Sequence, residues 1–415
     1  MPNRRVSLEK ARAAILPACC PLASEHVPLS DALGRVTYRE TKASRPVPRW
    51  DRSLKDGYAL ISAATAAATR KNPVTLRKAG VLYAGSYRNQ KLSANQATKV
   101  MTGALVPPGA DAVVPWEEVK EAGEGVRVVS FVPPGSNVEA QGQQLARGEV
   151  SVGSNLVLGP QQISRLACLG KARLEVYKRP RVAIMVIGDE LVALGKRVAK
   201  GKEVASNCYL LSALVTEAEA RPIFYGVVPD NKRMMVKLFR QTKDVDMVLS
   251  SGGASLGDKD LTGQALNELG AQIKYREVAI NPGRRHIFAL YRGRPLFGLP
   301  GSPLALTVVF EQLVRPGLLK MGGRRVLFRP LISASLTHSV KGRLGEATFR
   351  EAVVFRKGSR LLAQPVKGWC YARSWELDGS KGFICLKEDQ GEVEAGGRVT
   401  VQLMESADPL FGESI

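Results

Sequence analysis

The chain has 415 residues, of which 45% are hydrophobic and 6% aromatic, and this length predicts about two to four domains rather than one core. Its 60 Lys and Arg residues against 38 Asp and Glu give a net charge of +22, which favours anionic ligands. No apolar run reaches the roughly 18 residues of a membrane span, and the basic residues are dispersed among few aromatics, which disfavours a membrane or nucleic-acid partner.

The first 50 residues contain one predicted helix and one predicted extended segment. An amphipathic pattern predicts the helix over Leu8–Leu16, and Glu25–Tyr38 has the composition of a strand. Glu9 and Arg12 interrupt the apolar stretch that a secretory signal would need, so we expect a cytoplasmic protein. Two prolines in residues 45–50 predict a hinge.

Residues 46–138 are predicted to form a small β-rich domain, because short strand-like runs alternate with Gly and Pro. These runs are Val74–Lys78, Lys99–Met101, Ala112–Pro115 and Val126–Phe131. Residues 139–178 then predict a strand at Asn155–Leu158, a helix at Pro160–Leu169 and a strand at Arg173–Val176. If residues 1–45 and 139–178 pair, they form one discontinuous domain into which the β-rich domain is inserted.

Residues 179–325 carry the clearest pattern. Arg181–Val186 is a continuous apolar run, as in a parallel strand buried on both faces. A helix follows, with Ser206 or Asn207 as the predicted N-cap and with Tyr209, Leu210, Leu214 and Val215 on one face. The remaining predicted strands are Pro222–Val228, Asp246–Leu249, Ile273–Val278 and the hairpin Ile287–Leu290 with Arg294–Gly298, and the helices are Arg233–Arg240, Leu261–Leu269 and Leu304–Val314. This alternation predicts a three-layer α/β domain, which binds ligands outside the carboxyl ends of its strands.

Residues 326–415 lose the helical period and predict a small β-barrel or sandwich. The strand-like runs are Phe328–Ser333, Ala347–Phe355, Arg360–Gln364, Gly382–Leu386 and Arg398–Leu403. The six cysteines show no C-x-x-C spacing and are expected to be reduced and mostly buried. The three histidines are far apart, which gives little support to a zinc site.

A Gly-rich loop, GGASLGDKD at Gly252–Asp260, follows a predicted strand and precedes a predicted helix. Its glycines allow a ligand to approach the backbone, and the amides at the start of the following helix favour a phosphate. Ser251 and Ser255 could donate to phosphate oxygens, and Asp258 and Asp260 could hold a divalent cation. The alternative is a simple turn in which Asp260 caps the helix.

Three further loops fall at the same predicted edge of the sheet. Gly188–Leu191 (GDEL) places two adjacent carboxylates at a strand end, although a solvated capping turn would explain them equally well. Gly298–Pro303 (GLPGSP) is a rigid turn with exposed amides. Asn281–Arg285 (NPGRR) supplies two guanidinium groups, which suit oxyanions. Each loop is weak evidence alone, but together they predict one anionic ligand site.

In the N-terminal half, Ser53–Ala59 (SLKDGYA) and Lys99–Ala104 (KVMTGA) contain Asp56 and Thr102, which a turn and a strand end would also explain. Read in order with the GDEL, ASN (Ala205–Asn207), PD (Pro229–Asp230), SSGGASLGDKD, PGR and GLPGSP segments, however, they give the chain a specific pattern. In that order and spacing the chain resembles the molybdopterin molybdenumtransferases, the MoeA and gephyrin E-domain family. The resemblance covers residues 5–325 well and 326–415 loosely.

The resemblance implies four domains: a discontinuous domain I (1–45 and 139–178), an inserted β-rich domain II (46–138), an α/β molybdopterin-binding domain III (179–325) and a β-barrel domain IV (326–415). It implies a homodimer whose site lies between domain III of one subunit and the N-terminal domains of the other. It also implies hydrolysis of adenylylated molybdopterin, dependent on molybdate and on a divalent cation such as Mg²⁺, with insertion of molybdenum. The molybdopterin adenylyltransferase and acceptor molybdoenzymes are the implied protein partners.

Carried over by motif, the family's functional residues are Asp56, Thr102, Glu190, Asp230 and Asp260, with Glu190 and Asp260 as Mg²⁺ ligands. The substrate-binding set implied by the same motifs is Ser251, Gly252, Gly253, Ser255, Gly257, Asp258, Pro282, Gly283, Arg284, Pro300, Gly301, Ser302, Pro303 and Arg350.

Several positions depart from the family pattern. Ile187 replaces a threonine before GDEL, and Ala205 replaces an aspartate in the usual DSN triplet. The acidic pair after domain II is Gln143-Gln144, and Glu139 or Ala140 stands where an arginine is usual. The usual KPGKP segment is Asn281-Pro282-Gly283-Arg284-Arg285, so one lysine is lost and the other is an arginine, while Ser374 is the stand-in for a serine near the barrel. Either a modified site remains active, or the chain is a paralogue that binds molybdopterin or its nucleotide as a carrier.

Overall fold

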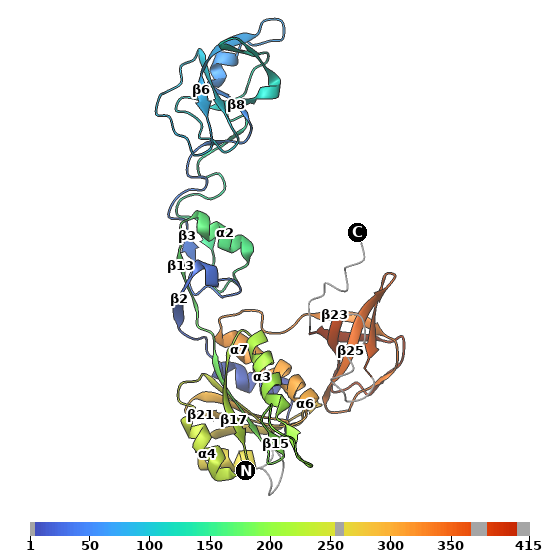
Figure 1. Cartoon of the computed structure of the whole chain (residues 1–415). Coiled ribbons are helices and arrows are strands. Elements are labelled where there is room, and N and C mark those ends of the chain that lie inside the picture. The colour runs from blue at the N-terminus through green and yellow to red at the C-terminus, as the bar shows by residue number, and fades with distance from the viewer. Residues whose placement is uncertain (1–4, 254–260, 367–379, 405–415) are drawn as a thin grey trace. The chain divides into compact units, whose positions relative to one another are not determined.

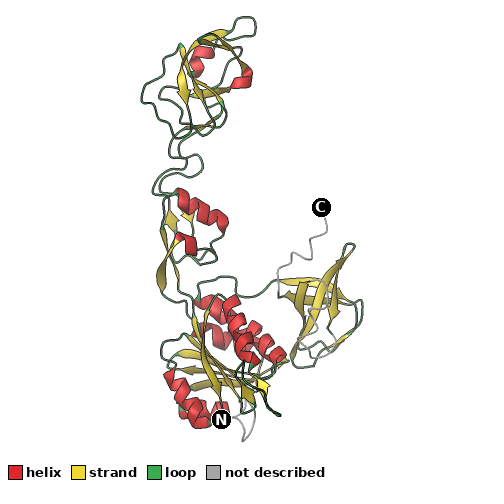
Figure 2. Cartoon of the chain, in the orientation of Figure 1, coloured by secondary structure: helices red, strands yellow, loops and turns green. Residues whose placement is uncertain are grey.

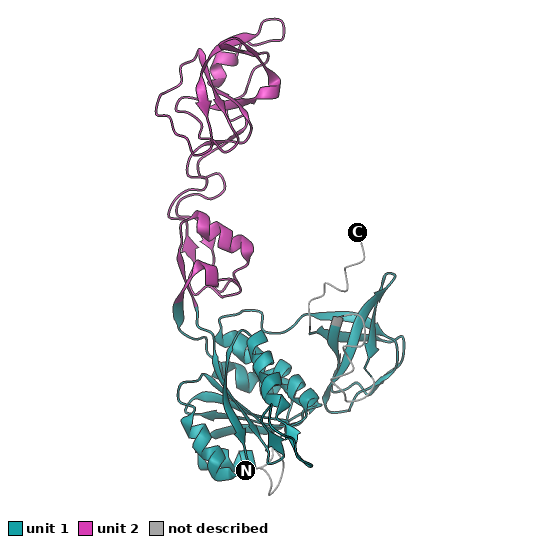
Figure 3. Ribbon diagram, in the orientation of Figure 1, with its two compact units in different colours: residues 1–25, 177–415 teal, residues 26–176 magenta. Residues whose placement is uncertain are grey.

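The computed structural model describes residues 5–253, 261–366 and 380–404. The chain forms two compact units, one of residues 26–176 and one of residues 1–25 with 177–415 (Figure 1, Figure 3). None of the helices in the described ranges is long and apolar enough to cross a membrane.

The larger unit is built on a seven-stranded mixed sheet (Figure 2). The sheet order is β1 (Arg5–Val6), β19 (Gln272–Val278), β21 (Arg285–Tyr291), β22 (Arg294–Leu299), β18 (Met247–Ser251), β14 (Arg181–Ile187) and β17 (Arg221–Val228). β14 pairs in parallel with both of its neighbours and is buried from Val182 to Ile187, so the prediction of a buried parallel strand is confirmed.

Helices cover both faces of this sheet, which explains the continuous apolar run in β14. Ile184 lies in a core on one face with α1 (Leu8–Ile15), α3 (Ser206–Glu217), α6 (Pro303–Val309), a π-helical turn (Phe310–Val314) and α7 (Arg315–Met321). Met185 lies in the core of the opposite face with α4 (Lys232–Gln241) and α5 (Leu261–Glu268). Successive side chains of a strand point to opposite faces of the sheet. Because helices cover both faces here, the residues of β14 that point to either face must be apolar.

The prediction for the start and the buried face of α3 is wrong in detail. The N-cap position is Ala205, which has no side chain to cap the helix, and the buried face consists of Cys208, Leu211, Leu214 and Val215. Tyr209 is 52% exposed. The i, i+3, i+7 spacing that starts at Cys208 gives the buried face of the helix. The predicted face starts at Tyr209 instead, one residue later.

The C-terminal part of this unit contains a closed five-stranded β-barrel, which confirms the predicted barrel. Its strands close in the order β25 (Ala347–Lys357), β26 (Arg360–Pro365), β23 (Leu331–Leu336), β29 (Arg398–Leu403) and β27 (Ser380–Leu386), which returns to β25. β24 (Val340–Lys341) and β28 (Glu392–Val393) form a separate short pair. β20 (Ile280–Asn281), from the α/β part, pairs in parallel with β25.

The smaller unit contains a six-stranded sheet in the order β8 (Ala112–Pro115), β5 (Gly57–Leu60), β7 (Gln96–Val100), β6 (Val74–Leu82), β10 (Gly125–Val128) and β9 (Val119–Ala122). Tyr58, Leu76 and Val126 lie in its core. The predicted runs in this region all contribute strands, with β6 extending four residues beyond Lys78.

The segments before and after that sheet pair with each other, as the sequence suggested they could. The pairs are β2 (Ser24–Pro28) with β13 (Arg173–Tyr177), β3 (Thr41–Lys42) with β12 (Val150–Val152) and β4 (Arg52–Ser53) with β11 (Val138–Glu139), and α2 (Pro160–Cys168) packs nearby.

Two predicted strands in these segments are wrong. The extended segment 25–38 is a strand only as far as Pro28, where a 3-10 turn (Leu29–Asp31) begins. Asn155–Leu158 makes a single bridge, between Val157 and Val36, because Asn155 has a positive φ of 55° that breaks the extended backbone.

The cysteines are less uniformly buried than predicted. Cys19 and Cys208 are buried, whereas Cys20 and Cys168 are exposed. Burial raises the pKa of the Cys19 thiol to about 12. The apolar residues around Cys20 and Cys168 in sequence belong to a turn and a helix end, so their neighbours in sequence do not cover them.

Candidate functional site

Five loops gather at one end of the seven-stranded sheet. The parallel strands β17, β14, β18 and β22 all end there, and β21 begins there because it runs antiparallel to β22. Four of these loops are the ones predicted at this edge: Gly188–Leu191 after β14, Ser251–Gly253 at the end of β18, Pro300–Pro303 after β22 and Asn281–Arg285 before β21. The fifth carries Asp230 after β17. This is the end at which open α/β sheets bind ligands.

A crevice is expected between β14 and β18, because the chain leaves these neighbours in opposite directions. It passes from β14 through α3 to β17 on one side, and from β18 through α5 to β19 on the other. Gly252 lies at this point with φ +89°, and a Cβ there would be 2.1 Å from the carbonyl oxygen of Ile187. Only glycine therefore allows the two loops to approach so closely.

The rest of the Gly-rich loop lies outside the described residues. The predicted site residues affected are Ser255, Gly257, Asp258 and Asp260. Ser374, from the segment near the barrel, also lies outside them.

One asparagine ties two of these loops to the start of α3. Asn207, at the start of α3, donates from Nδ2 to Ser251 Oγ over 2.9 Å and to the carbonyl oxygen of Gly301 over 2.7 Å. Ser251 Oγ in turn donates to the carbonyl oxygen of Pro300 over 3.1 Å. The buried Oδ1 atom of Asn207 has no hydrogen-bond partner within the described residues, so it is an acceptor at the site.

The sequence predicts neither the role of Asn207 as a link between loops nor the hydrogen bond of Ser251 to Pro300. Asn207 belonged to the ASN triplet but not to the predicted site, and Ser251 was expected to donate to a phosphate. The signal for Asn207 was its position directly after the short strand β16 (Glu203–Val204), at the start of a helix that follows a parallel strand.

The acidic residues of this sheet end interlock. The backbone N–H of Asp230 donates to Asp189 Oδ1 over 3.1 Å, and the backbone N–H of Asp189 donates to Asp230 Oδ2 over 3.4 Å. Lys202 Nζ donates to the carbonyl oxygen of Asp189 over 2.6 Å. Asp189 therefore belongs to the site. In the sequence it is only one of two adjacent acidic residues in the GDEL loop, with no role assigned to it. The reciprocal bonds hold the loops after β14 and β17 at a fixed separation.

Glu190 is exposed and lies over the backbone of Gly188. A Cβ on Gly188 would be 2.6 Å from Glu190 Oε2, so a side chain at position 188 would displace this carboxylate. The Glu190 carbonyl oxygen accepts from the N–H of Glu203 over 2.9 Å, which joins β15 (Leu191–Val192) to β16. The backbone of Glu190 is therefore fixed while its carboxylate faces solvent.

These carboxylates suit a hard cation such as Mg²⁺, which takes oxygen ligands and usually keeps several waters. Within the described residues no three His, Cys, Asp or Glu side chains converge to hold a metal ion. Glu190 could therefore contribute one ligand to an ion completed by water and by substrate phosphates, and Asp260 stays a predicted second ligand.

The Asn281–Arg285 loop is joined to the barrel through a buried carboxylate. Glu346, 2% exposed, lies 3.7 Å from Arg284 Nη1, 2.9 Å from Arg5 Nη2 and 3.6 Å from Arg343 Nη1. Three guanidinium groups around one carboxylate leave this corner with two excess positive charges. Arg285 faces Glu277 at 4.0 Å.

The predicted residues Pro282, Gly283 and Arg350 lie near this corner. Asn281 pairs with Thr348 in β25, two residues before Arg350. Gly283 has φ +107°, and its carbonyl oxygen accepts from His286 Nδ1 over 2.8 Å.

We expect His286 to make stability depend on pH. Burial lowers the pKa of His286 to about 4, against about 6.5 when unfolded. As pH falls from 6.5 to 4, the unfolded chain binds a proton that the folded chain does not, so the free energy of unfolding falls by roughly 3 kcal/mol. Urea unfolding at pH 7 and pH 4 should show this loss in the wild type and a loss about 3 kcal/mol smaller in His286→Phe. Parallel losses in the two proteins would contradict the assignment.

In the smaller unit, Asp56 and Thr102 contact each other. Asp56 Oδ1 accepts from the Thr102 backbone N–H over 2.7 Å and from Thr102 Oγ1 over 2.8 Å. These two hydrogen bonds, the backbone one first, lower the pKa of Asp56. The pair is a fixed, ionised carboxylate beside a hydroxyl, at the start of β5 and the end of β7. It belongs to a different unit from Glu190 and Asp230.

Two of the positions that depart from the family pattern have structural partners here. Gln144 Nε2 donates to Glu139 Oε1 over 2.6 Å, and Arg52 Nε donates to the other oxygen of the same carboxylate. The hydrogen bond from Arg52 is the main cause that lowers the pKa of Glu139. Ala205 is buried at the N-cap of α3. Glu139 and Gln144 therefore form one hydrogen-bonded set with Arg52, rather than two independent changes of charge.

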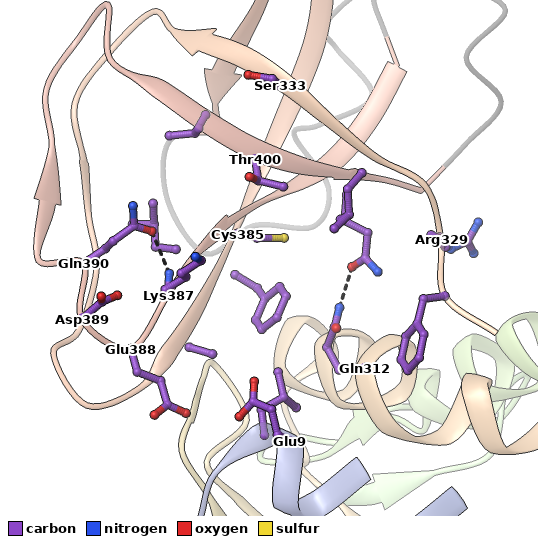
Figure 4. A pocket seen from close by; sticks show the side chains of 18 of the residues that line it. Glu9, Gln312, Arg329, Ser333, Cys385, Lys387, Glu388, Asp389, Gln390 and Thr400 are labelled. Atoms are coloured by element: carbon purple, nitrogen blue, oxygen red, sulfur yellow. Dashed lines mark hydrogen bonds between the residues drawn. The ribbon is translucent and has the colours of Figure 1, made fainter. Parts of the chain in front are cut away.

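A cavity of about 930 Å³ lies elsewhere in the larger unit, between α1, the π-helical turn and the strands β23, β27 and β29 (Figure 4). None of the predicted site residues lines it. Its central polar groups bond to each other: Arg12 Nη2 donates to Gln312 Oε1 over 2.6 Å, and Gln312 Nε2 donates to Gln402 Oε1 over 2.5 Å. Burial lowers the pKa of Arg12, whose guanidinium also lies 4.6 Å from the centre of the Phe328 ring. This cavity is therefore separate from the loops at the sheet end.

Two protein-family models match successive parts of the chain. Residues 6–170 match the family model described as the MoeA N-terminal region (domain I and II), and residues 183–320 match the one described as a probable molybdopterin binding domain.

Relatives and solved structures resemble the chain over most of its length. The molybdopterin molybdenumtransferase of Nostoc is 34% identical over 76% of this chain and 73% of its own length. Molybdopterin molybdenumtransferase 2 of Mycobacterium tuberculosis is 31% identical over 95% and 97%. A crystal structure of a molybdopterin biosynthesis MoeA protein from Pyrococcus horikoshii matches with a TM-score of 0.85 at 30% identity, covering 97% of this chain and all of that one.

Proposed function

The chain belongs to the molybdopterin molybdenumtransferase family, also called the MoeA family, and from that premise we propose that it inserts molybdenum from molybdate into adenylylated molybdopterin with release of AMP. Both substrates are anions, which suits a chain of net charge +22. Hydrolysis breaks the pyrophosphate bond of the adenylate, and water supplies the new oxygen.

The observation that carries this proposal is the gathering of the loops at one sheet end. Ser251–Gly253 and Pro300–Pro303 are tied together by Asn207, and they place backbone close to the crevice between β14 and β18. A phosphate-bearing pterin can be held there by backbone amides and by the unpartnered Oδ1 of Asn207, which accepts from an N–H or O–H of the ligand. Arg284 and Arg350 supply positive charge from the neighbouring loop and strand.

We assign the chemistry to the carboxylates. Asp230 is positioned through its reciprocal bonds with Asp189, and Glu190 presents a free carboxylate beside them. Mg²⁺, held by Glu190 and Asp260, would neutralise charge on the pyrophosphate. Asp56 and Thr102 would position water or molybdate, as a carboxylate and a hydroxyl in contact can. The family resemblance implies a homodimer, and we propose that in it Asp56 and Thr102 act at the site of the neighbouring subunit.

The expected partners follow from the reaction. An enzyme that transfers an adenylyl group to molybdopterin must supply the substrate, and a molybdoenzyme must accept the product. We therefore propose contacts with the molybdopterin adenylyltransferase and with acceptor molybdoenzymes.

AMP release tests the proposal directly. Purified protein is incubated with adenylyl-molybdopterin, Mg²⁺ and molybdate, and AMP is measured by chromatography. We expect AMP only when all three are present, with little release when molybdate is omitted or when Mg²⁺ is chelated.

The opposite outcome has a clear meaning. Binding of the pterin nucleotide in a calorimeter, without AMP release under any of these conditions, would reject the enzyme and support a carrier of the cofactor. A salt titration of DNA binding covers the remaining alternative, because binding carried by dispersed surface charge falls steeply with salt.

A further inference from the structure

A second cavity, lined by cations, lies in the smaller unit, far along the chain from the loops described above. It has a volume of about 220 Å³ and is formed by β6, β7 and residues 88–92, and we call it the β6–β7 pocket. Four of its lining residues are cations: Arg77, Lys78, Arg88 and Lys91. The others are Ala79, Gln90, Leu92, Gln96, Thr98 and Pro107, so no carboxylate lines the pocket among the described residues.

Most of this positive charge is not neutralised by the residues that the structure describes. Arg88 donates to the carbonyl oxygen of Ala79 and, over 2.9 Å, to Gln90 Oε1. These two acceptors are neutral, so they fix the orientation of the Arg88 guanidinium group without compensating its positive charge. For Arg77, Arg88 and Lys91 no ion pair with a described carboxylate occurs.

Lys78 is the one cation of the pocket that meets a carboxylate within the described part of the chain. Its Nζ atom lies 2.5 Å from Glu121 Oε2. Glu121 is already shared, because it also accepts from Tyr58 Oη over 2.5 Å and pairs with Lys99 at 3.4 Å. Hydrogen bonds, first that from Lys78, lower the pKa of Glu121 to about 2. Glu121 therefore already has Lys78, Lys99 and Tyr58 as partners, and the pocket keeps a net positive charge.

Neutral donors complete the lining. Gln96 Oε1 accepts from the backbone N–H of Ser93 over 3.1 Å, which orients its amide and leaves Nε2 to donate. Thr98, 2% exposed, adds a hydroxyl. A shift of register between Lys78 and Val81 opens the ladder between β6 and β7 here. The volume exceeds the roughly 30 Å³ of one water several-fold, so a tetrahedral oxyanion fits with part of its hydration shell.

We propose that the β6–β7 pocket binds one oxyanion, either inorganic or as the phosphoryl group of a small molecule. The like charges of Arg77, Arg88 and Lys91 repel one another, and a bound anion replaces that repulsion with charge-assisted hydrogen bonds from these three side chains. A planar, pre-oriented Arg88 and the amide of Gln96 give the site geometry as well as charge. This site is independent of the proposed active site, since it shares no residue with it.

Amide hydrogen exchange, measured peptide by peptide in the full chain, distinguishes binding at this pocket from binding at the sheet-end loops. Inorganic phosphate, molybdate and AMP are titrated separately at constant ionic strength, and amide exchange is followed in peptides spanning residues 74–98. The double variant Arg77→Ala/Lys91→Ala removes two exposed cations of the pocket. The matched control Lys120→Ala/Arg127→Ala removes two exposed cations of β9 and β10 in the same sheet but outside the pocket.

We expect saturable protection of residues 74–98 by at least one of the three anions in the wild type and in the control, and at least a tenfold weaker affinity in the pocket variant. Protection by phosphate or molybdate identifies an inorganic oxyanion site, and protection by AMP alone identifies a phosphoryl group on an organic molecule. Equal affinities in the two double variants, or no protection by any of the three, would overturn the proposal. AMP release by the pocket variant is measured in parallel, so that failure of this site is distinguishable from failure of the proposed reaction.

Discussion

Replacing Glu190 with glutamine is expected to slow AMP release at least a hundredfold while pterin-nucleotide binding changes only a few-fold. The side chain keeps its shape, but a neutral amide neither binds a divalent cation as a carboxylate does nor accepts a proton. Loss of such a group from catalysis costs about 10²–10⁴ in rate. The carboxylate faces solvent over Gly188 at the end of β14, so its loss removes no buried contact.

The matched control is Glu203→Gln. Glu203 is exposed, lies in the adjacent strand β16 and bonds to Glu190 only through its backbone N–H. We expect it to keep the wild-type rate. Comparable AMP release by the two variants would show that Glu190 has no catalytic part, and the carboxylate chemistry would then have to lie with Asp230 and its neighbours.

The second large effect concerns stability. Glu311, whose side chain is 1% exposed, accepts from Arg329 Nε over 2.7 Å and from Arg329 Nη2 over 3.1 Å, and it lies 3.8 Å from Arg315. Burial lowers the pKa of Arg329, but the bonds and charges of Glu311 and Glu217 outweigh this and raise it. Breaking a buried ion pair from one side typically costs about 3–5 kcal/mol, because an uncompensated charge remains. Glu311→Gln should therefore lower the free energy of unfolding by about that amount.

Urea unfolding measures this loss, and Glu217→Gln is the matched control. Glu217 pairs with the same Arg329 at 2.6 Å, but its side chain is 52% exposed, so its removal should cost about 1 kcal/mol or less. Equal losses in the two variants would show that burial does not set the strength of this network.

The sequence predicts the larger elements well because their patterns are local. A seven-residue apolar strand such as β14, buried on both faces, leaves an unbroken hydrophobic run, and the loss of helical period after residue 326 marks the barrel. The errors occur where one residue decides the local structure. Asn155 breaks an expected strand by its positive φ, and Ala205 occupies an N-cap position that the neighbouring Ser206 and Asn207 would have filled.

For the candidate site, the sequence predicts which loops matter but not how they are joined. The loops follow strand ends, and strand order places parallel ends on one side. The bond from Asn207 to Gly301 spans 94 residues, and that from Arg5 to Glu346 spans 341. No periodicity within a window of the chain can predict contacts at such separations, so the partners of Asp189, Asn207 and Glu346 are found only in the fold.

The arginine cluster at Glu346 means that the α/β part of the chain is not a separable module. Arg284 comes from the loop before β21, Arg5 from the edge strand β1 and Arg343 from the barrel, and all three share one carboxylate. A fragment limited to residues 179–325 would lose that carboxylate, the edge strand and the helix α1 that covers part of its core. A chain cut at these boundaries would therefore leave Arg284 without its carboxylate, even though every loop motif was kept.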